Sequence, residues 1–486
     1  MKKISFIAIA IFSMLLVSCG GDKKQQNEKS LTMYCAAGIK KPIEKLAKEY
    51  TEKYGVTIDI QYGGSGTLLS NLQLSDKGDL YLAGEKSYLE IAREKNLVDE
   101  VQPLASMRPV IIVHKSNPKN VKGLDDLLRK DLNVSLGNPG SAAVGKLTQI
   151  MFERKGKWDE LKEKTKVFKP TVCELVLDVN LGALDACIGW DITAKQYKDV
   201  ETVDIPEAAD LTSTVEIGVL KTCKQPTEAL KFIRFLASKE FGNKTFAEFG
   251  FTPVDGDHWE EKPKIVLFSG GVNRLAVEPV IQKFEEREGV EFTRVYNGCG
   301  ILVAQIKAGT MPDAYLTCDT SFMAQVSPLF DNIEDVTTTK IIIITQLGNP
   351  KGIKTFADLT QKGLKVGSCN PEQSALGAIV KNMLVKQKLW DKILPNVCSQ
   401  TPTADLLVNQ LRTGALDAAI VYISNVTKVK DKVNIVYLQG PDDSAVQNYG
   451  IVKKSNNRWV MKRFLEALHS KEAVESYSTN GMNVIK

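Results

Sequence analysis

Apolar residues in the first half of the chain follow two alternating patterns, one typical of strands and the other typical of helices. Short runs rich in β-branched and aromatic residues occupy 30–36, 56–62 and 79–84. Between the first two runs, residues 41–54 carry an apolar stripe at helical spacing, and Gly55 follows as a stop signal. This order of strand, helix and strand predicts a parallel sheet covered by helices.

The alternation begins again further along the chain. Residues 108–115 and 340–346 are the most β-branched stretches of the two halves and are typical of buried strands. A predicted helix at 122–128 opens a second series of helices and strands, which ends in a glycine turn before another strand. Residues 214–221 and 448–454 predict strands that return the chain to the first series. Each half is therefore expected to contain two α/β lobes.

Several motifs of the first half recur in the same order in the second half. The string GALDA stands at 182–186 and again at 414–418. The other recurring pairs are YGGSGTLLSNLQ with YNGCGILVAQIK, GDLYLAGE with PDAYLTCD, and LGNPGSAAVG with SCNPEQSALG. Because internal repeats indicate repeated structural units, we interpret the chain as a duplicated domain. We place the two copies at 31–255 and 263–486, joined by a linker at 256–262.

The N-terminus has the features of a secretory signal. Two lysines precede an apolar run at 4–17 that is too short for a permanent membrane span. The ending Leu-Val-Ser-Cys resembles a bacterial lipobox, which implies cleavage before Cys19 and lipid attachment to its thiol. Residues 1–19 are thus expected to be a lipoprotein signal peptide, and the polar residues 20–30 a flexible tether. The alternative is an ordinary secretory cleavage site with an incidental cysteine.

This leader predicts a protein of the bacterial cell envelope, anchored by lipid on the periplasmic side of a membrane or at the cell surface. The composition is that of globular domains, with 43% hydrophobic and 25% charged residues among 486. The net charge of +5 is modest, and Lys and Glu are interleaved along the helices, so nucleic acid is not an expected partner. Cysteines other than Cys19 could form disulfides in an oxidising compartment, in pairings that the sequence does not determine.

The ordered set of motifs, present twice, resembles the molybdate-binding periplasmic proteins of ABC transporters. The set comprises a strand ending in Ala-Ala-Gly or Ser-Gly-Gly, a Gly-Ser-Gly-Thr-type turn, an Asp-led strand, an Asn-Pro loop and the GALDA turn. The resemblance implies an α/β fold of two tandem type II periplasmic-binding domains, each with two lobes that close on a ligand in a cleft. It also implies capture of a small oxyanion, molybdate or tungstate first, for an ABC permease. No pattern indicates a cofactor.

Loops that leave the carboxyl ends of parallel strands and enter helices present unpaired N–H groups, which suit an anion. By the resemblance, small residues, a hydroxyl and an aromatic residue in these loops coordinate the oxyanion. The family usually carries Ser where Gly38 and Gly271 stand, and its aromatic Tyr is kept as Tyr422 but replaced by Trp190. The candidate ligand residues are Ala37, Gly38, Ser65, Ala83, Gly84, Ala143, Val144 and Trp190 in the first half, and Gly271, Cys299, Thr317, Cys318, Ala375, Leu376 and Tyr422 in the second.

Three thiols distinguish the second half from the first. Cys299, Cys318 and Cys369 each align with a position of the first half that carries no cysteine, and each falls in a predicted ligand loop. Soft thiolates select metals such as Zn or Cu(I), so these residues are candidate metal ligands. The alternatives are a disulfide between neighbouring loops and small buried cysteines that act as hydrophobic residues.

Enzymatic chemistry is not indicated by the sequence. Nucleophilic catalysis needs a base beside the nucleophile, and no such pair is visible. Asp185 and Asp417 in the GALDA turns are interpreted as turn caps, and Glu85 and Asp319 as helix caps. We therefore expect a binding protein. The alternative is a soft-metal-handling protein or an enzyme that uses the cysteine-containing second cleft.

Overall fold

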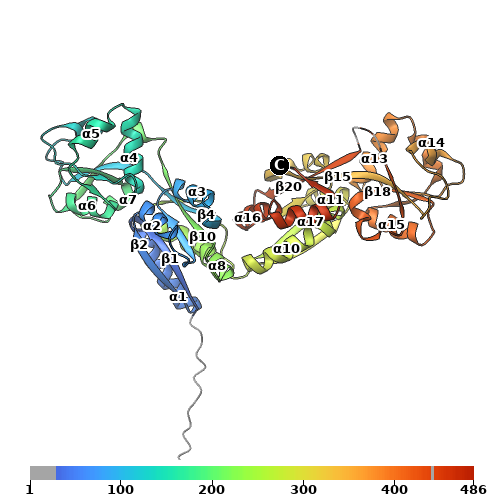
Figure 1. The fold of residues 1–486 in the computed structure, drawn as a ribbon, viewed down its shortest axis with the longest axis horizontal. Helices are drawn as coiled ribbons and strands as arrows, with labels where there is room; N and C mark the ends of the chain where they lie inside the picture. Colours follow the sequence, from blue (N-terminus) through green and yellow to red (C-terminus); the bar gives the residue numbers. More distant parts are fainter. Residues whose placement is uncertain (1–28, 439, 441–442, 486) are drawn as a thin grey trace, which may run out of the picture.

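The computed structural model describes residues 29–438, 440 and 443–485. Figure 1 shows two mixed α/β domains, each divided into two lobes. The predicted signal peptide, the lipobox with Cys19 and most of the tether lie outside the described residues. None of the helices within the described part of the chain combines the length and the apolar character needed to cross a membrane.

The first lobe of the first domain is built on a mixed sheet. Its elements are β1 (Lys29–Ala36), η1 (Ala37–Ile39), α1 (Lys40–Tyr54), β2 (Val56–Gly63), α2 (Ser65–Leu72), β3 (Leu80–Ala83), α3 (Ser87–Glu94), β4 (Val98–Met107), β10 (Ser213–Leu220), α8 (Pro226–Ala237), α9 (Lys244–Glu248) and β11 (Thr252–Pro253). The strand order is β11-β4-β10-β3-β1-β2. β1 runs parallel to β2 and β3, as predicted, because a helix crosses back over the sheet after β1 and after β2. β10 returns from the second lobe, as predicted, and runs antiparallel to β3 and β4, so the sheet is mixed.

The second lobe of the first domain has a smaller, divided sheet. Its elements are β5 (Pro109–His114), η2 (Leu124–Leu128), β6 (Leu136–Gly137), α4 (Ala143–Arg154), α5 (Trp158–Lys164), β7 (Phe168–Lys169), α6 (Val172–Asn180), β8 (Ala186–Trp190), α7 (Asp191–Ala194), β9 (Val200–Val203) and η3 (Pro206–Ala208). β5 lies between β8 and β9, and β6 pairs with β7. The helix predicted at 122–128 is a 3-10 helix, η2, and the strand predicted before the Asn-Pro loop is only two residues long.

The second domain repeats this plan with a continuous sheet. Its elements are β12 (Lys264–Gly270), η5 (Gly271–Asn273), α10 (Arg274–Glu288), β13 (Glu291–Asn297), α11 (Cys299–Lys307), β14 (Ala314–Leu316), α12 (Thr320–Ala324), β15 (Phe330–Thr345), η7 (Phe356–Thr360), β16 (Val366–Cys369), α13 (Ala375–Lys386), α14 (Trp390–Ile393), β17 (Val397–Thr401), α15 (Ala404–Arg412), β18 (Ala418–Tyr422), β19 (Asn434–Tyr437), β20 (Ser444–Val452), α16 (Arg458–Leu468), α17 (Lys471–Thr479) and β21 (Met482–Val484). β15 spans both lobes, pairing with β20 in one and with β18 in the other. In the first domain, two consecutive strands, β4 and β5, take the place of the single strand β15.

The recurrence of GALDA has a structural reason in both domains. Gly182 and Gly414 end a helix with φ of 72° and 79°, a region that residues with a side chain rarely adopt. The Asp185 carboxylate accepts the N–H of Asn133 at 2.7 Å, and the Asp417 carboxylate accepts that of Lys365 at 2.9 Å. The prediction that these carboxylates cap their own turns is therefore wrong, because each accepts an N–H from a segment 52 residues earlier in the chain.

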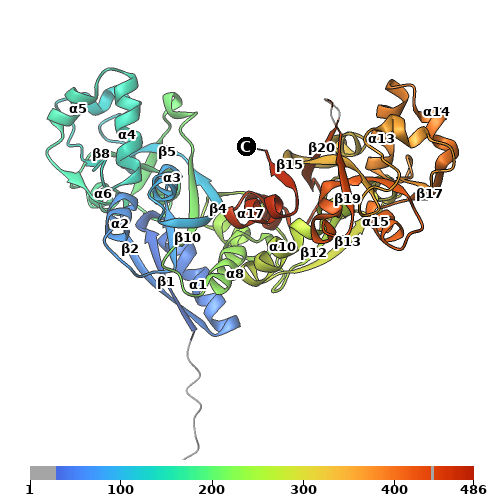
Figure 2. The ribbon, with the colours of Figure 1, turned by 45° about the vertical axis from the view of Figure 1, so that its right-hand side comes forward.

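The two domains pack against each other through α8 of the first domain and α10 of the second, which lie side by side at the interface (Figure 2). Glu288 on α10 is the centre of this interface, with a side chain only 1% exposed. It pairs with Arg234 of the first domain at 2.8 Å and with Arg463 of α16 at 2.6 Å. Arg463 also donates to Gln102 of the first domain at 2.6 Å. A buried ion network thus joins the domains.

The predicted linker at 256–262 is part of this interface. The Asp257 carboxylate accepts the N–H groups of Trp459 at 3.0 Å and Val460 at 3.2 Å, at the N-terminus of α16. Trp259 packs edge-on against Phe235 of α8, with ring centroids 5.3 Å apart. The linker is therefore held by contacts to both domains.

Candidate functional site

A small cavity lies between the two lobes of the first domain. Its volume is about 20 Å³, which is room for a compact ligand only. None of the residues that line it carries a charge. They are Ala36, Ala37, Gly38, Ile39, Gly63, Gly64, Ser65, Gly84, Met107, Ala142, Ala143, Val144, Thr171, Val172 and Trp190.

Helix N-termini from both lobes converge on this cavity. η1 and α2 begin at it from the first lobe, and α4 and α6 begin at it from the second lobe. No side chain caps η1, α2 or α4, so their first N–H groups are not paired by a cap. Unpaired N–H groups and the positive ends of helix dipoles favour an anion at this point.

The first cleft is closed around the cavity. Gly66 at the start of α2 donates its N–H to the carbonyl of Ser141 in the Asn-Pro loop of the opposite lobe, at 2.9 Å. A Cβ on Gly66 would overlap the carbonyl oxygen of Gly140, and one on Gly64 would overlap those of Ser141 and Pro170. The glycines of the GGSG motif therefore allow the lobes to approach closely.

Most of the candidate ligand residues of the first half meet at this cavity. Ala37, Gly38, Ser65, Gly84, Ala143, Val144 and Trp190 line it, whereas Ala83 is buried in β3 just before the loop. The Ser65 hydroxyl accepts the N–H of Gly84 at 3.1 Å, which leaves its hydrogen free to point at a ligand. Lys146, on α4, donates to the Ser87 hydroxyl at 2.6 Å and is not part of the lining.

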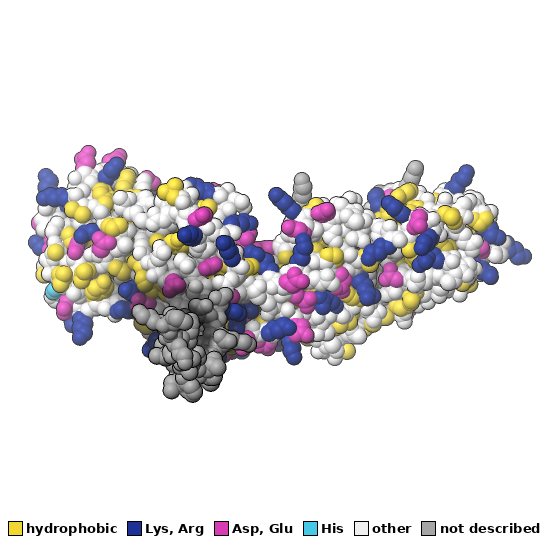
Figure 3. Space-filling view, turned by 60° about the horizontal axis from the view of Figure 1, so that its bottom comes forward, with side chains coloured by type: hydrophobic (Ala, Val, Ile, Leu, Met, Phe, Trp, Pro, Cys, Tyr) yellow, Lys and Arg dark blue, Asp and Glu magenta, His cyan; other side chains and the backbone are white. Residues whose placement is uncertain are grey.

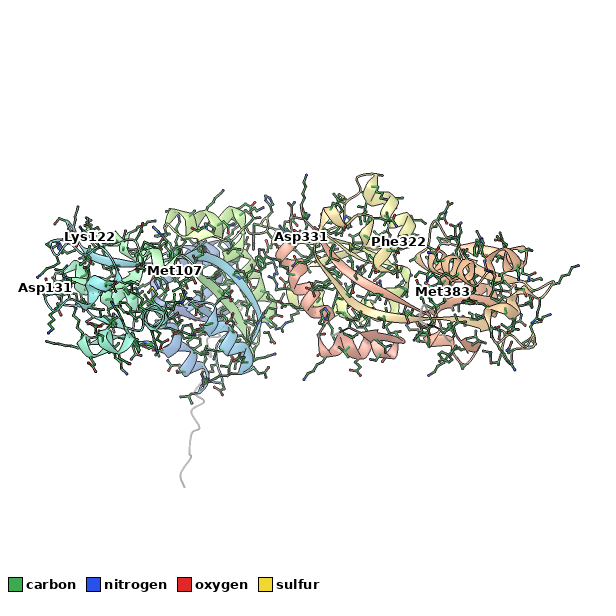
Figure 4. All side chains as sticks on the ribbon, turned by 90° about the horizontal axis from the view of Figure 1, so that it is seen from above. Met107, Lys122, Asp131, Phe322, Asp331 and Met383 are labelled. Atoms are coloured by element: carbon green, nitrogen blue, oxygen red, sulfur yellow. The ribbon has the colours of Figure 1, made fainter. Side chains whose placement is uncertain are left out.

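Sequence reasoning missed other residues of the cavity. Thr171 could have been found, because Thr171 and Glu174 have the spacing of a capping box and exchange hydrogen bonds. Met107 had no such signal; it ends β4 and lies where the two lobes meet (Figure 4). Thr193 carries a buried hydroxyl without a partner, 3.9 Å from the place of a Cβ on Gly38. It is a further candidate donor.

The second cleft closes in the same way as the first. Gly300 donates its N–H to the carbonyl of Gln373 at 3.0 Å, across the lobes. A Cβ on Gly300 would overlap the carbonyl oxygen of Glu372, and a Cβ on Gly298 would overlap that of Gln373. The NGCG turn of the second domain therefore needs glycine at these two positions for the same reason as the GGSG turn of the first: the lobes approach each other closely there.

The strand register corrects one alignment made from sequence. Met33 lies beside Leu80 in the first domain, and Leu267 lies beside Ala314 at the same place in the second. η5 is therefore the counterpart of η1, so that Gly271 corresponds to Ala37 and Val272 to Gly38. The pairing of Gly38 with Gly271 was wrong by one residue, because the two loops have no distinctive residue to fix it.

The remaining candidates of the second half differ in what they offer a ligand. Tyr422 is 3% exposed and its hydroxyl has no partner, so it can still donate to a ligand. The Thr317 hydroxyl is already used, because it donates to Asn448 Oδ1 and accepts the Asn448 N–H at 3.2 Å. Ala375 and Leu376 open α13, the counterpart of α4, at a terminus without a side-chain cap.

The hypothesis of a three-thiol metal site is not supported by the geometry. Cys299 and Cys318 are in contact, but within the described residues no group of three or more His, Cys, Asp or Glu side chains is arranged to hold a metal ion. Burial raises the pKa of the Cys369 thiol to about 12, which disfavours the thiolate that a metal requires. What remains of the three-thiol cluster is the contact between the Cys299 and Cys318 thiols.

The acidic residues that follow the third strands are helix caps, as predicted. Glu85 accepts the N–H of Ser87 at 3.1 Å at the start of α3. Asp319 accepts the N–H of Ser321 at 3.0 Å at the start of α12. Each carboxylate is thus engaged by an N–H at the start of the helix that follows it.

Comparison with known proteins finds one family twice in the chain. The bacterial extracellular solute-binding protein family matches residues 31–252 and again 265–483. A candidate binding protein of Haemophilus influenzae is 30% identical over 255 residues, which are 52% of this chain and all of that protein. A candidate ABC transporter substrate-binding lipoprotein of Bacillus subtilis, YvgL, is 26% identical over 52% of this chain and 98% of its own length.

The molybdate-binding protein ModA of Mycobacterium bovis is 27% identical over 208 residues, covering 41% of this chain and 77% of its own length. Each of these relatives is therefore matched by about half of the chain, as expected for a duplication. Two copies of the family, each with two lobes closed over a cleft, make up most of the sequence. The chain belongs to the bacterial extracellular solute-binding protein family.

Proposed function

We propose that this protein captures a compact divalent oxyanion outside the cytoplasm, molybdate or tungstate first and sulfate next, for uptake by an ABC permease. The observation that carries this proposal is the charge-free cavity of the first domain, on which the uncapped starts of η1, α2 and α4 converge. Each neutral N–H or hydroxyl donor gains strength when its acceptor is charged. A relative named as a molybdate-binding protein supports the choice of anion.

The size and the chemistry of the cavity restrict the ligand class. A cavity volume of about 20 Å³ suits a compact tetrahedral ion better than a sugar or a peptide. The donors at the cavity include N–H groups and the Ser65 hydroxyl, and the lining includes no carboxylate for a metal cation. An anion is therefore the ligand that the closed first cleft suits best.

We also propose that the protein is a lipoprotein of the cell envelope, attached through Cys19. Support comes from the lipobox-like ending of the leader and from a Bacillus subtilis relative named as a lipoprotein.

On the face shown in Figure 3, basic and acidic side chains are interspersed without a basic stripe. This distribution agrees with a small-molecule ligand and not with nucleic acid as the partner.

The Ser65→Ala substitution tests the oxyanion site. We expect it to weaken binding to the first domain by about 1.5 to 3 kcal/mol, because it removes a hydrogen bond to a charged ligand. Isothermal titration calorimetry with molybdate, tungstate and sulfate, on protein freed of endogenous ligand by unfolding and refolding, measures the change. Thr67→Ala, an exposed neighbour on α2, is the matched control. If the folded wild-type protein gives no heat with any of the three anions, the proposal is wrong.

A further inference from the structure

The floor of the second cleft contains two thiols where the first cleft has a serine and a glycine. Cys299 Sγ and Cys318 Sγ lie 2.7 Å apart, and both thiols are free in the structure. Cys299 is fully buried and Cys318 is 6% exposed. A small rotation of either side chain would bring the sulfur atoms to the roughly 2.05 Å of a disulfide bond.

Two hydrogen bonds fix the position of Cys318 next to Cys299. The N–H of Cys318 donates to Cys299 Sγ at 3.0 Å, as the N–H of Gly84 donates to Ser65 Oγ at 3.1 Å in the first domain. The carbonyl of Cys318 accepts a hydrogen bond from Gln447 Nε2 at 3.0 Å. Cys299 opens α11 as Ser65 opens α2, and Cys318 follows β14 as Gly84 follows β3, so both cysteines occupy positions that the first domain also uses.

A third position beside the pair also differs between the two domains. Gly270 ends β12, where the first domain has Ala36 at the end of β1. A Cβ on Gly270 would overlap Cys318 Sγ and lie 3.0 Å from Cys299 Sγ. The glycine thus leaves the space that the second sulfur atom fills, so three positions fit together around one sulfur–sulfur contact.

We propose that Cys299 and Cys318 form a reversible disulfide in the floor of the second cleft, made by exchange with a small-molecule disulfide when the two lobes are open. One cysteine thiolate attacks the external disulfide and releases one thiol. The other thiolate then attacks the cysteine sulfur of the mixed disulfide and releases the second thiol. Two protons leave the cysteines, one external disulfide is reduced to two thiols, and one internal disulfide is formed.

This bond would change what the second cleft offers a ligand. A disulfide has no hydrogen to donate, whereas the Ser65 hydroxyl at the same place in the first cleft has one. Oxidation would therefore make the two clefts different in hydrogen bonding, and reduction would return a thiol donor. This consequence rests on the proposed function, while the disulfide itself does not.

Peptide mapping of the full-length protein tests the disulfide directly. Trypsin cuts after Arg294, Lys307 and Lys340, so Cys299 and Cys318 fall on the separate peptides 295–307 and 308–340. The protein is treated with oxidised glutathione, denatured in the presence of an alkylating agent, digested and analysed by mass spectrometry. We expect one species with the summed mass of both peptides less two hydrogen atoms, which separates into the two peptides on reduction.

Matched variants make the result specific. Cys299→Ser and Cys318→Gly each install the residue of the first domain and are expected to fold, and each should abolish the linked species. Cys398→Ser changes an exposed cysteine and should leave it unchanged. The proposal is overturned if both peptides are recovered alkylated after oxidation, or if either is linked to the peptide 366–381 that carries Cys369. Neither result depends on whether the cleft binds an anion.

Discussion

Replacing Glu288 with alanine is expected to destabilise the protein by about 3 to 5 kcal/mol, the range for breaking a buried ion pair by removing one partner. Glu288 is the only carboxylate that contacts both Arg234 and Arg463 among the described ion pairs, and these two arginine side chains are 8% and 4% exposed. Without it, two positive charges would face each other at the domain interface with little access to water.

Urea unfolding followed by circular dichroism measures this change. Glu286→Ala, an exposed residue of the same helix α10, is the control and should change the free energy of unfolding by less than about 0.5 kcal/mol. Equal effects of the two substitutions would show that the interface does not depend on Glu288. Two separate unfolding transitions in the Glu288 variant, in place of one, would show that the domains had uncoupled.

The same carboxylate predicts a dependence of stability on pH. Burial alone would raise the pKa of Glu288, but Arg463 and Arg234 outweigh burial and hold the pKa below its usual value. A depressed pKa in the folded state means that Glu288 stabilises the fold above its unfolded pKa of about 4.3, and that this contribution is lost as the pH falls through the folded value. We expect acid to lower the free energy of unfolding of the wild-type protein more steeply than that of Glu288→Gln, which a urea series between neutral and acidic pH would measure.

The Gly66→Ala substitution is expected to weaken anion binding to the first domain more than 100-fold. Its Cβ would overlap the carbonyl oxygen of Gly140, so the lobes could not close as they do in the structure. An open cleft leaves the ligand without the N–H groups at the starts of α4 and α6. Losing two hydrogen bonds to a charged ligand, at about 1.5 to 3 kcal/mol each, corresponds to at least about 100-fold in affinity.

Calorimetry measures the affinity, and small-angle X-ray scattering measures whether ligand still compacts the domain. Gly123→Ala is the matched control, because a Cβ there meets no atom within 4 Å and its φ of −173° suits any residue. Far-UV circular dichroism checks that both variants are folded. Wild-type affinity in Gly66→Ala would contradict a site that forms only when the lobes close.

The elements that carry the ligand loops could be predicted from local patterns. The helix at α1 ends at Gly55, whose φ of 67° is the left-handed conformation that the glycine signal predicts. Ser65, Ala143 and Trp190 were placed in one cleft because each follows the carboxyl end of a strand or opens a helix, and all three line the cavity. The long strand β4 was not predicted, since its residues alternate too weakly to be distinguished from a loop.

Contacts between distant segments could not be predicted in this way. Thr193 reaches the Gly38 loop, and Gly270 makes room for Cys318, only because separate loops are brought together by packing. The ion network of Arg234, Glu288 and Arg463 also involves residues far apart in sequence, with no motif to mark them.

The sequence by itself determined the duplication, the two-lobed α/β plan of each copy, and the loops that face the cleft. These features depend on periodicity, glycine positions and residue order, all of which are local properties of the chain. Only the tertiary structure decided that both clefts are closed, that two thiols touch in the second, and that a buried carboxylate joins the domains. The physical reason is that backbone overlap, sulfur contact and charge pairing depend on distances across the folded chain, which are set by the packing of whole lobes and not by neighbours in sequence.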